Sequence, residues 1–118
     1  MQDTTSARYV DIYLLPVPEA HLEGYREQAV AFGAVAREYG ALSYREFRGD
    51  DLDEQLRAGV GEGAVLTSAV AEFRSRAHRD EVMAKVLADP RVTALTDGEP
   101  LTDMGQMRYG GFELFVTG

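Results

Sequence analysis

A chain of 118 residues without cysteine has no disulfide bond, no thiolate nucleophile and no cysteine-ligated metal. The formal net charge of −8 argues against nucleic acid or an anionic membrane as the main partner, because phosphate binding needs a net basic face. No apolar run reaches membrane-spanning length, so we expect a cytoplasmic protein with a disordered tail at residues 1–8 and a single domain over residues 9–118.

The first half of the chain alternates between strand-like and helix-like patterns. Residues 9–15 are rich in aromatic and branched side chains and predict a strand that ends at the prolines of residues 16–18. From residue 22 onward, apolar side chains recur every three or four positions, which predicts a helix that ends before Gly40. Residues 41–48 return to alternation and predict a second strand.

The second half repeats this order after a loop. Its predicted elements are a short helix over 50–59, a strand over 65–73, a helix from its N-cap Ser75 to Asp89-Pro90, a connection over 91–111 and a strand over 112–116. The resulting order β-α-β-β-α-β is that of a ferredoxin-like α+β sandwich. Both long helices then lie on one face of a four-stranded antiparallel sheet.

Both faces of this predicted sheet carry apolar side chains. The first strand presents Val10, Ile12 and Leu14 on one side, and Tyr13 and Leu15 on the other. Two helices can cover only one face, and an exposed apolar face usually binds a partner. The simplest partner is a second copy related by a two-fold axis, so we expect a homodimer. The alternative is that the long connection after the second helix folds over this face.

Four sequence stretches run in order along nearly the whole chain: YVDIYLLPVP (9–18), YGALSYREFRGDD (39–51), FRSRAHRDEVMAKVLADPR (73–91) and MRYGGFE (107–113). Together they resemble the domain of unknown function 1428 family. This resemblance implies a ferredoxin-like subunit that pairs into a dimeric α/β barrel, in agreement with the two apolar faces. The wider barrel superfamily includes cofactor-free monooxygenases, isomerases and haem enzymes. No catalytic residues carry over from the family itself.

A basic cluster opens the second long helix. Arg76, His78 and Arg79 lie where free backbone N–H groups could help them to bind a carboxylate or phosphate. The alternative, which we favour, is that they pair with some of the 20 acidic residues or clamp a neighbouring segment. His78 also lies on the apolar stripe of this helix. Such a histidine is usually hydrogen-bonded at the edge of a core, yet it is the first candidate for an acid–base role.

Two acids lie within predicted strands that are neighbours in this fold. Asp11 and Glu113 could approach each other, raise one another's pKa and form a proton-transfer pair. Alternatively, each pairs with an arginine such as Arg45 or Arg108 in the dimer interface. Four tyrosines are candidates to line a pocket for an aromatic ligand, although core packing explains them equally well: Tyr13, Tyr25, Tyr44 and Tyr109.

We therefore expect a homodimer that binds a small organic molecule, aromatic or carboxylate-bearing, between sheet and helices, with no metal and no cofactor. The two histidines lack zinc-ligand spacing, and no dinucleotide or P-loop motif is present. One alternative is a cofactor-independent monooxygenase- or isomerase-like enzyme. It would use His78 or the Asp11/Glu113 pair to move protons and Arg76 or Arg79 to hold an anionic group. The other alternative is a purely structural dimer.

Overall fold

The computed structural model describes residues 7–98 and 100–118, so residues 1–6 of the expected tail lie outside the described residues. The strands are β1 (Tyr9–Pro18), β2 (Ser43–Arg48), β3 (Ala64–Phe73) and β4 (Arg108–Glu113). The helices are α1 (Leu22–Glu38), α2 (Glu54–Ala58), α3 (Arg76–Ala88) and α4 (Pro90–Thr93). Short 3-10 turns are η1 (Glu19–His21), η2 (Ala94–Thr96) and η3 (Met104–Gln106).

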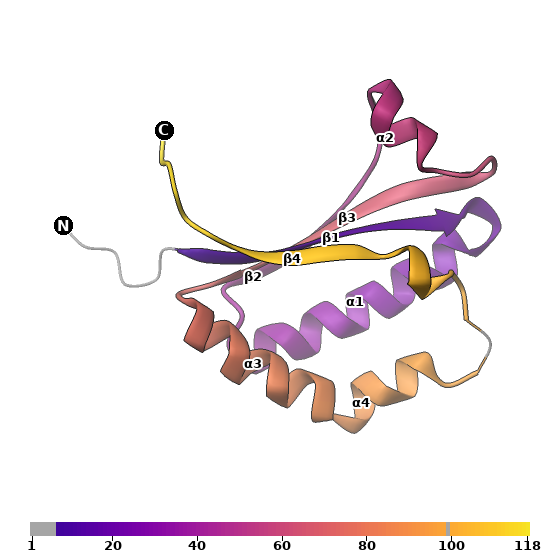
Figure 1. Ribbon diagram of the computed structural model, residues 1–118. Coiled ribbons are helices and arrows are strands. Elements are labelled where there is room, and N and C mark those ends of the chain that lie inside the picture. The colour runs from indigo at the N-terminus through magenta and orange to yellow at the C-terminus, as the bar shows by residue number, and fades with distance from the viewer. Residues whose placement is uncertain (1–6, 99) are drawn as a thin grey trace.

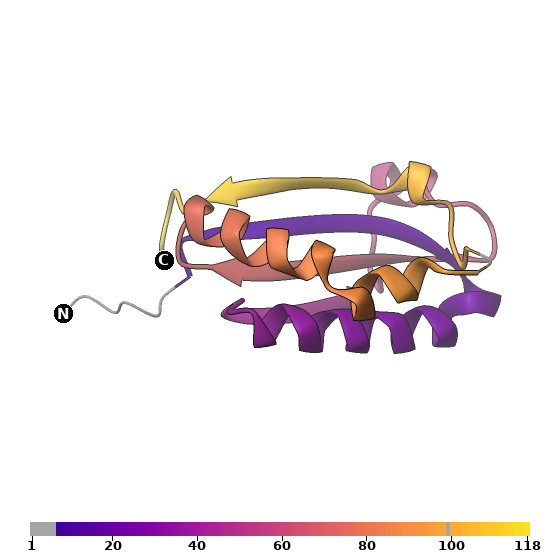
Figure 2. The same ribbon diagram turned by 90° about the horizontal axis from the view of Figure 1, so that it is seen from below.

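The strands form one antiparallel sheet in the order β2-β3-β1-β4. Helices α1, α3 and α4 lie on one side of this sheet, and the short helix α2 projects on the other side (Figures 1 and 2). The predicted α+β sandwich is therefore confirmed, with β2 and β4 at the two edges of the sheet.

The core lies between the sheet and the two long helices. Phe73 at the end of β3 is fully buried against Val82 and Val86 of α3. Burying each of these side chains stabilises the fold by roughly 1.5–3 kcal/mol. Further along β3, the next helix-facing positions hold the short side chains of Ala71, Ala69 and Thr67. Ala69 and Thr67 line the cavity described below.

β1 continues past the point predicted from the sequence. The strand was expected to end at the prolines, but it includes Pro16 and Pro18. The reason is that pairing with β4 stops at Leu14, so the second half of β1 has a neighbour on one side only. Proline is tolerated there because it has no N–H to donate to a second neighbour.

β4 begins and ends earlier than predicted. Residues 112–116 were expected to form it, but it spans Arg108–Glu113, and the predicted turn at Gly110-Gly111 lies inside the strand. A Cβ atom at Gly111 would lie 2.1 Å from the hydroxyl of Tyr9, so only glycine fits beside this ring. After Glu113 the chain leaves the sheet (Figure 1). Phe115 in this last segment is 95% exposed.

On the sheet face opposite the long helices, Pro16 and Leu66 are buried, whereas the side chains over the first half of β1 stay partly exposed among the described residues; we call this face the open face. Tyr9 and Asp11 contact α3, so the alternate positions Val10, Ile12 and Leu14 point to the open face. Phe47 and Phe112, which also point there, are 50% and 54% exposed. The alternative that the connection after α3 covers this face is wrong. Helix α4 lies on the helix side of the sheet (Figure 1), and so do residues that follow it, such as Leu95, Leu101 and Met107.

Candidate ligand-binding site

A cavity of about 600 Å³ lies between the helix-facing side of the sheet and the helices. It exists because Thr67 and Ala69 of β3 are short, while α1 and the connection after α3 close over them. Most of its lining is apolar and comes from every layer of the fold. The apolar residues include Leu15, Ala29, Phe32, Ala69, Met83, Leu87, Val92, Leu95, Leu101, Met104 and Met107.

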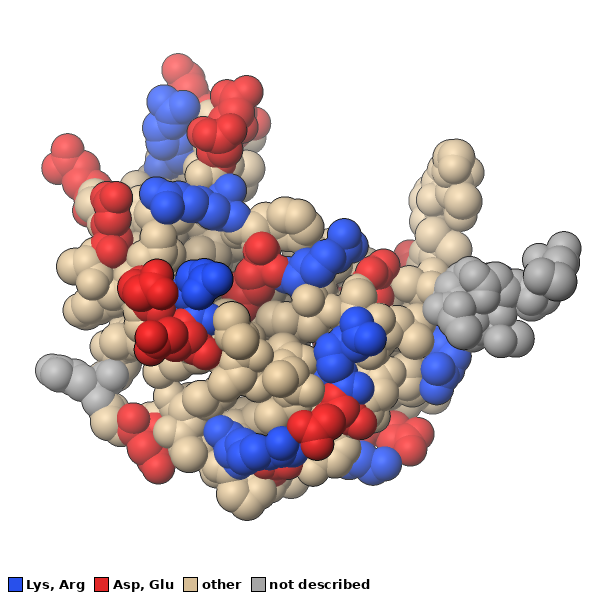
Figure 3. Space-filling view, turned by 180° about the vertical axis from the view of Figure 1, so that it is seen from behind, with Lys and Arg blue, Asp and Glu red and all other residues tan. Residues whose placement is uncertain are grey.

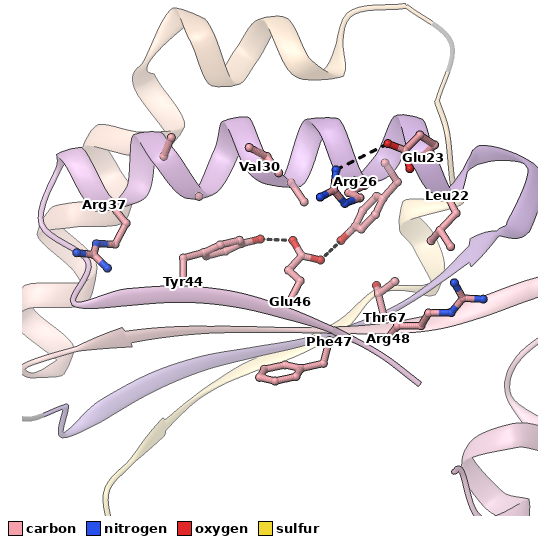
Figure 4. A pocket seen from close by; sticks show the side chains of 14 residues that line it. Leu22, Glu23, Arg26, Val30, Arg37, Tyr44, Glu46, Phe47, Arg48 and Thr67 are labelled. Carbon is pink, nitrogen blue, oxygen red and sulfur yellow. Dashed lines mark hydrogen bonds and ion pairs between the residues drawn. The ribbon is translucent and has the colours of Figure 1, made fainter. Parts of the chain in front are cut away.

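One acidic side chain lines this cavity. Glu46 of β2 is its single charged lining residue within the described part of the chain. The hydroxyl of Tyr25 donates to Glu46 Oε1 at 2.6 Å, and the hydroxyl of Tyr44 donates to Glu46 Oε2 (Figure 4). Because Tyr25 belongs to α1 and Tyr44 to β2, this Tyr25–Glu46–Tyr44 cluster links the helix layer to the sheet.

The local sequence explains how the cluster is positioned. Tyr44 and Glu46 are two residues apart on β2 and therefore share the helix-facing side of the strand. The ring of Tyr44 lies directly on α1 at Gly33, where a Cβ atom would be 2.6 Å from Tyr44 Cδ2. The ring of Phe32 packs against the ring of Tyr44 in a tilted arrangement, with the two centroids 5.5 Å apart. The close approach thus depends on a glycine in the middle of α1.

Burial keeps the tyrosines of the cavity protonated. It raises the pKa of Tyr25 and of Tyr44 well above the usual range, and the Glu46 carboxylate raises both pKa values further. For Tyr13, burial and then the neighbouring Asp11 carboxylate raise the pKa to about 12. All three hydroxyls are therefore neutral hydrogen-bond donors at physiological pH.

The same cluster borders a second hollow on the outside of the molecule. A groove of about 660 Å³ runs between α1 and β2 and shares Tyr25, Glu46 and Tyr44 with the inner cavity. Three arginines line only the groove: Arg26, Arg37 and Arg48 (Figure 4). The cluster therefore borders both a groove whose lining includes three arginines and a cavity whose lining includes none among the described residues.

The structure places all four predicted tyrosines at the cavity. Tyr13, Tyr25, Tyr44 and Tyr109 each contribute to its lining. Tyr13 and Tyr109 are cross-strand partners, and their rings stack with centroids 5.5 Å apart. Their role in binding stays a prediction. Glu46, which sequence reasoning missed, could have been found from its spacing of two residues from Tyr44 on a predicted strand.

Asp11 and Glu113 do not form the pair that was considered from the sequence. Asp11 lies opposite Gly111, whereas Glu113 lies opposite Tyr9 and is exposed. Asp11 is 1% exposed and accepts a hydrogen bond of 2.7 Å from Arg79. Its counter-ion therefore comes from α3, not from the strand arginines that were the alternative. Burial raises the pKa of Asp11, and Arg79 opposes this effect.

Arg76, His78 and Arg79 do not converge on one point. Arg79 turns inward and also donates to the Tyr9 hydroxyl at 3.1 Å, while Arg76 is exposed at the start of α3. His78 Nδ1 accepts from the backbone N–H of Arg74 at 3.0 Å, and its ring meets Phe73 edge-on. Burial and then nearby Arg74 lower the pKa of His78. The ion pairs of Arg79 favour the structural alternative.

Charge elsewhere is mixed. On the face shown in Figure 3, basic and acidic side chains are interspersed over the surface.

Within residues 7–98 and 100–118, His, Asp and Glu side chains form no group of three suited to a metal ion. No helix in these same ranges combines the length and the apolar character needed to cross a membrane.

Comparison with known proteins gives one family and several related folds. The family model described as "Protein of unknown function (DUF1428)" matches residues 8–103. Uncharacterized protein YbaA of Escherichia coli K12 is 29% identical over 115 residues, which cover 92% of this chain and 97% of YbaA.

Three solved structures share the fold at low sequence identity. PA3566 from Pseudomonas aeruginosa has a TM-score of 0.59 and 13% identity, covering 97% of this chain and 100% of its own. A dimeric ferredoxin-like protein from an uncultured marine organism has a TM-score of 0.53 and 12% identity, with coverages of 98% and 97%. SnoaB, a cofactor-independent oxygenase from Streptomyces nogalater, has a TM-score of 0.54 and 18% identity, with coverages of 95% and 97%. These likenesses establish a ferredoxin-like fold, as the sequence predicted.

Proposed function

We propose that this chain, which belongs to the DUF1428 family of proteins of unknown function, binds a small apolar molecule in the cavity between its sheet and helices. The observation that carries this proposal is the cavity itself, about 600 Å³ in volume and mostly apolar, with one hydrogen-bonded carboxylate in its wall. Small-molecule sites are typically concave and apolar, of about 300–1,000 Å³, with a few polar groups that orient the ligand.

The lining favours a neutral aromatic ligand over a carboxylate. Arg76 and Arg79, which were considered as anion-binding residues, lie outside the cavity. Within the described residues, no arginine, lysine or histidine lines it. A ligand carboxylate would therefore be buried beside Glu46 without a counter-ion, which is costly.

Binding is a better supported proposal than catalysis. The residues considered for proton transfer, His78, Asp11 and Glu113, do not line the cavity. SnoaB is described as a cofactor-independent oxygenase, but a likeness at 18% identity extends to the fold only.

The proposal is tested with an apolar fluorescent probe, 2-methoxynaphthalene. We expect saturable binding to the protein, and loss of that binding in Ala29→Phe, whose new ring would fill the cavity from α1. Ala84→Phe, on the exposed side of α3, is the matched control and should bind as the original protein does. Binding that survives Ala29→Phe would place the probe elsewhere. Absence of saturable binding of both this probe and 2-naphthol would reject the proposal.

We further propose that two copies pair through their open faces. The apolar side chains exposed there, including Phe47 and Phe112, are the kind of surface that a partner covers. One protein of similar fold is described as dimeric, which supports the proposal. Light scattering should give twice the chain mass of 13.0 kDa. Val70→Lys, on the open face, should reduce it to one chain, whereas Val30→Lys on α1 should not. A single-chain mass for the original protein at high concentration would refute pairing.

A further inference from the structure

We propose that the molecule bound in this cavity carries a hydrogen-bond donor, as a phenol or an enol does, and that Glu46 accepts this hydrogen bond. The inference rests on the proposed function, since it names the chemical class of ligand for the same cavity. It follows from which polar groups of the lining are already used and which are free.

Several hydrogen-bond donors of the lining, those around Glu46 among them, are occupied within the protein. The hydroxyls of Tyr25 and Tyr44 both donate to Glu46. Three further side chains donate to backbone carbonyls: Gln28 to Leu95 at 2.9 Å, Thr67 to Leu15 at 2.9 Å and Thr102 to Pro16 at 2.5 Å. A ligand that only accepts hydrogen bonds would have to break one of these bonds or bind the hydroxyls of Tyr13 and Tyr109, which also line the cavity. A hydrogen bond to Glu46, the one charged residue of the lining within the described part of the chain, is open only to a ligand that donates.

The acceptor capacity of Glu46 is only partly used. A carboxylate has about four lone-pair sites, and the two tyrosines fill one on each oxygen. The remaining sites belong to a charged acceptor beside an apolar cavity, where a hydrogen bond is stronger than in water. A donor on the ligand satisfies them without disturbing the tyrosines, which continue to hold the carboxylate in place.

The negative charge of Glu46 favours a neutral ligand that donates a hydrogen bond over a ligand that is an anion. Glu46 is the only charged residue of the described part of the chain that lines the cavity. Three arginines, Arg26, Arg37 and Arg48, line the outer groove that Glu46 also borders, and none of them lines the cavity. A phenol is therefore expected to bind as the neutral molecule, with its proton directed at Glu46, and its anion is expected to be repelled.

The first test compares two probes of the same shape, 2-naphthol and its methyl ether 2-methoxynaphthalene. A hydrogen bond to a charged group predicts that 2-naphthol binds about tenfold or more tightly. Glu46→Gln should remove most of this preference and leave binding of the ether within about twofold. The matched control is Glu27→Gln, an exposed glutamate of α1 that lines neither hollow, and it should change neither affinity.

The outcomes separate this inference from the proposed function. Equal affinity of the original protein for the two probes would refute the donor inference and leave the cavity as a binding site. The donor inference would equally be refuted if Glu46→Gln kept the full preference for 2-naphthol. Failure of both probes to bind would refute the proposed function itself. The comparison on the original protein does not depend on whether the Glu46 variant folds.

The second test uses pH and 4-nitrophenol, whose anion absorbs visible light. The titratable groups that face Glu46 are Tyr25 and Tyr44, and burial raises the pKa of both. The charged residues that line the groove beside Glu46 are Arg26, Arg37, Arg48 and Glu23, and none of them lines the cavity. The affinity should therefore fall as pH rises through the pKa of the phenol, and added protein should weaken the visible band. A stronger visible band on binding, which means that the anion is preferred, would overturn the inference.

Discussion

Replacing Arg79 by methionine should strongly destabilise the protein at neutral pH, because the change leaves a buried carboxylate without its counter-ion. Asp11 is 1% exposed, and the Arg79 side chain that pairs with it is 18% exposed. Removing one partner of a buried ion pair typically costs about 3–5 kcal/mol. Since Arg79 retains some contact with water, we expect about 3 kcal/mol, which corresponds to a fall in Tm of about 12 °C for a domain of this size.

The pH dependence of this loss identifies its cause. Burial raises the pKa of folded Asp11 above its unfolded value, and loss of Arg79 should raise it further. A raised pKa of an acid means that the folded state gains stability at low pH and loses it as pH rises through that pKa. The difference between Arg79→Met and the original protein should therefore shrink as the pH is lowered.

The assay is urea unfolding followed by circular dichroism at several pH values and one protein concentration. The double variant Asp11→Asn/Arg79→Met is the control, because it has no charge to bury. It should be more stable at neutral pH than Arg79→Met alone. A loss that is independent of pH, or a double variant no more stable than the single one, would refute the explanation by a buried unpaired charge.

Three further substitutions test the local contacts. Gly33→Ala should cost about 1–3 kcal/mol in thermal unfolding, because its Cβ atom would overlap the ring of Tyr44; an unchanged Tm would contradict the close contact. Ser75→Ala should cost about 1 kcal/mol in the same assay, because the Ser75 hydroxyl accepts from the backbone N–H of His78 at 3.0 Å and caps α3. Asp89→Ala should destabilise at neutral pH and progressively less in acid. Hydrogen bonds from Arg91 and Tyr39 hold the Asp89 pKa well below its usual value, so its contribution is lost as pH falls; a loss that persists in strong acid would contradict this.

The elements that depend on local signals were predictable from the sequence. The period of α1 ends where Gly40 adopts a φ of +118°, which only glycine reaches easily. Ser75 caps α3 as expected, and Asp89-Pro90 separates α3 from α4. In each case the residues that determine the structure are close in sequence. These helix boundaries can therefore be predicted from a single amino-acid sequence.

The contacts between distant residues were not predictable in the same way. The glycine pair of β4 was read as a turn, since nothing near it in sequence indicates that the ring of Tyr9 needs the space at Gly111. The counter-ion of Asp11 is 68 positions away, and strand alternation alone does not reveal that α3 brings Arg79 to it. That Tyr44 and Glu46 share one side of a strand could be predicted from their spacing. That Tyr25 contacts Glu46 could not, because this contact depends on how α1 packs on the sheet.

The strand order has a consequence for aggregation. In the part of the chain that the structure describes, β2 and β4 each have one side without a neighbouring strand, and such edges are sites where further strands can add and start fibril growth. On β2, the exposed side chains of Arg45 and Arg48 flank Phe47, so an incoming strand would have to dehydrate two cations. Charged side chains at that border therefore disfavour open-ended polymerisation through β2, and they leave the flat side of the sheet for the pairing that we propose.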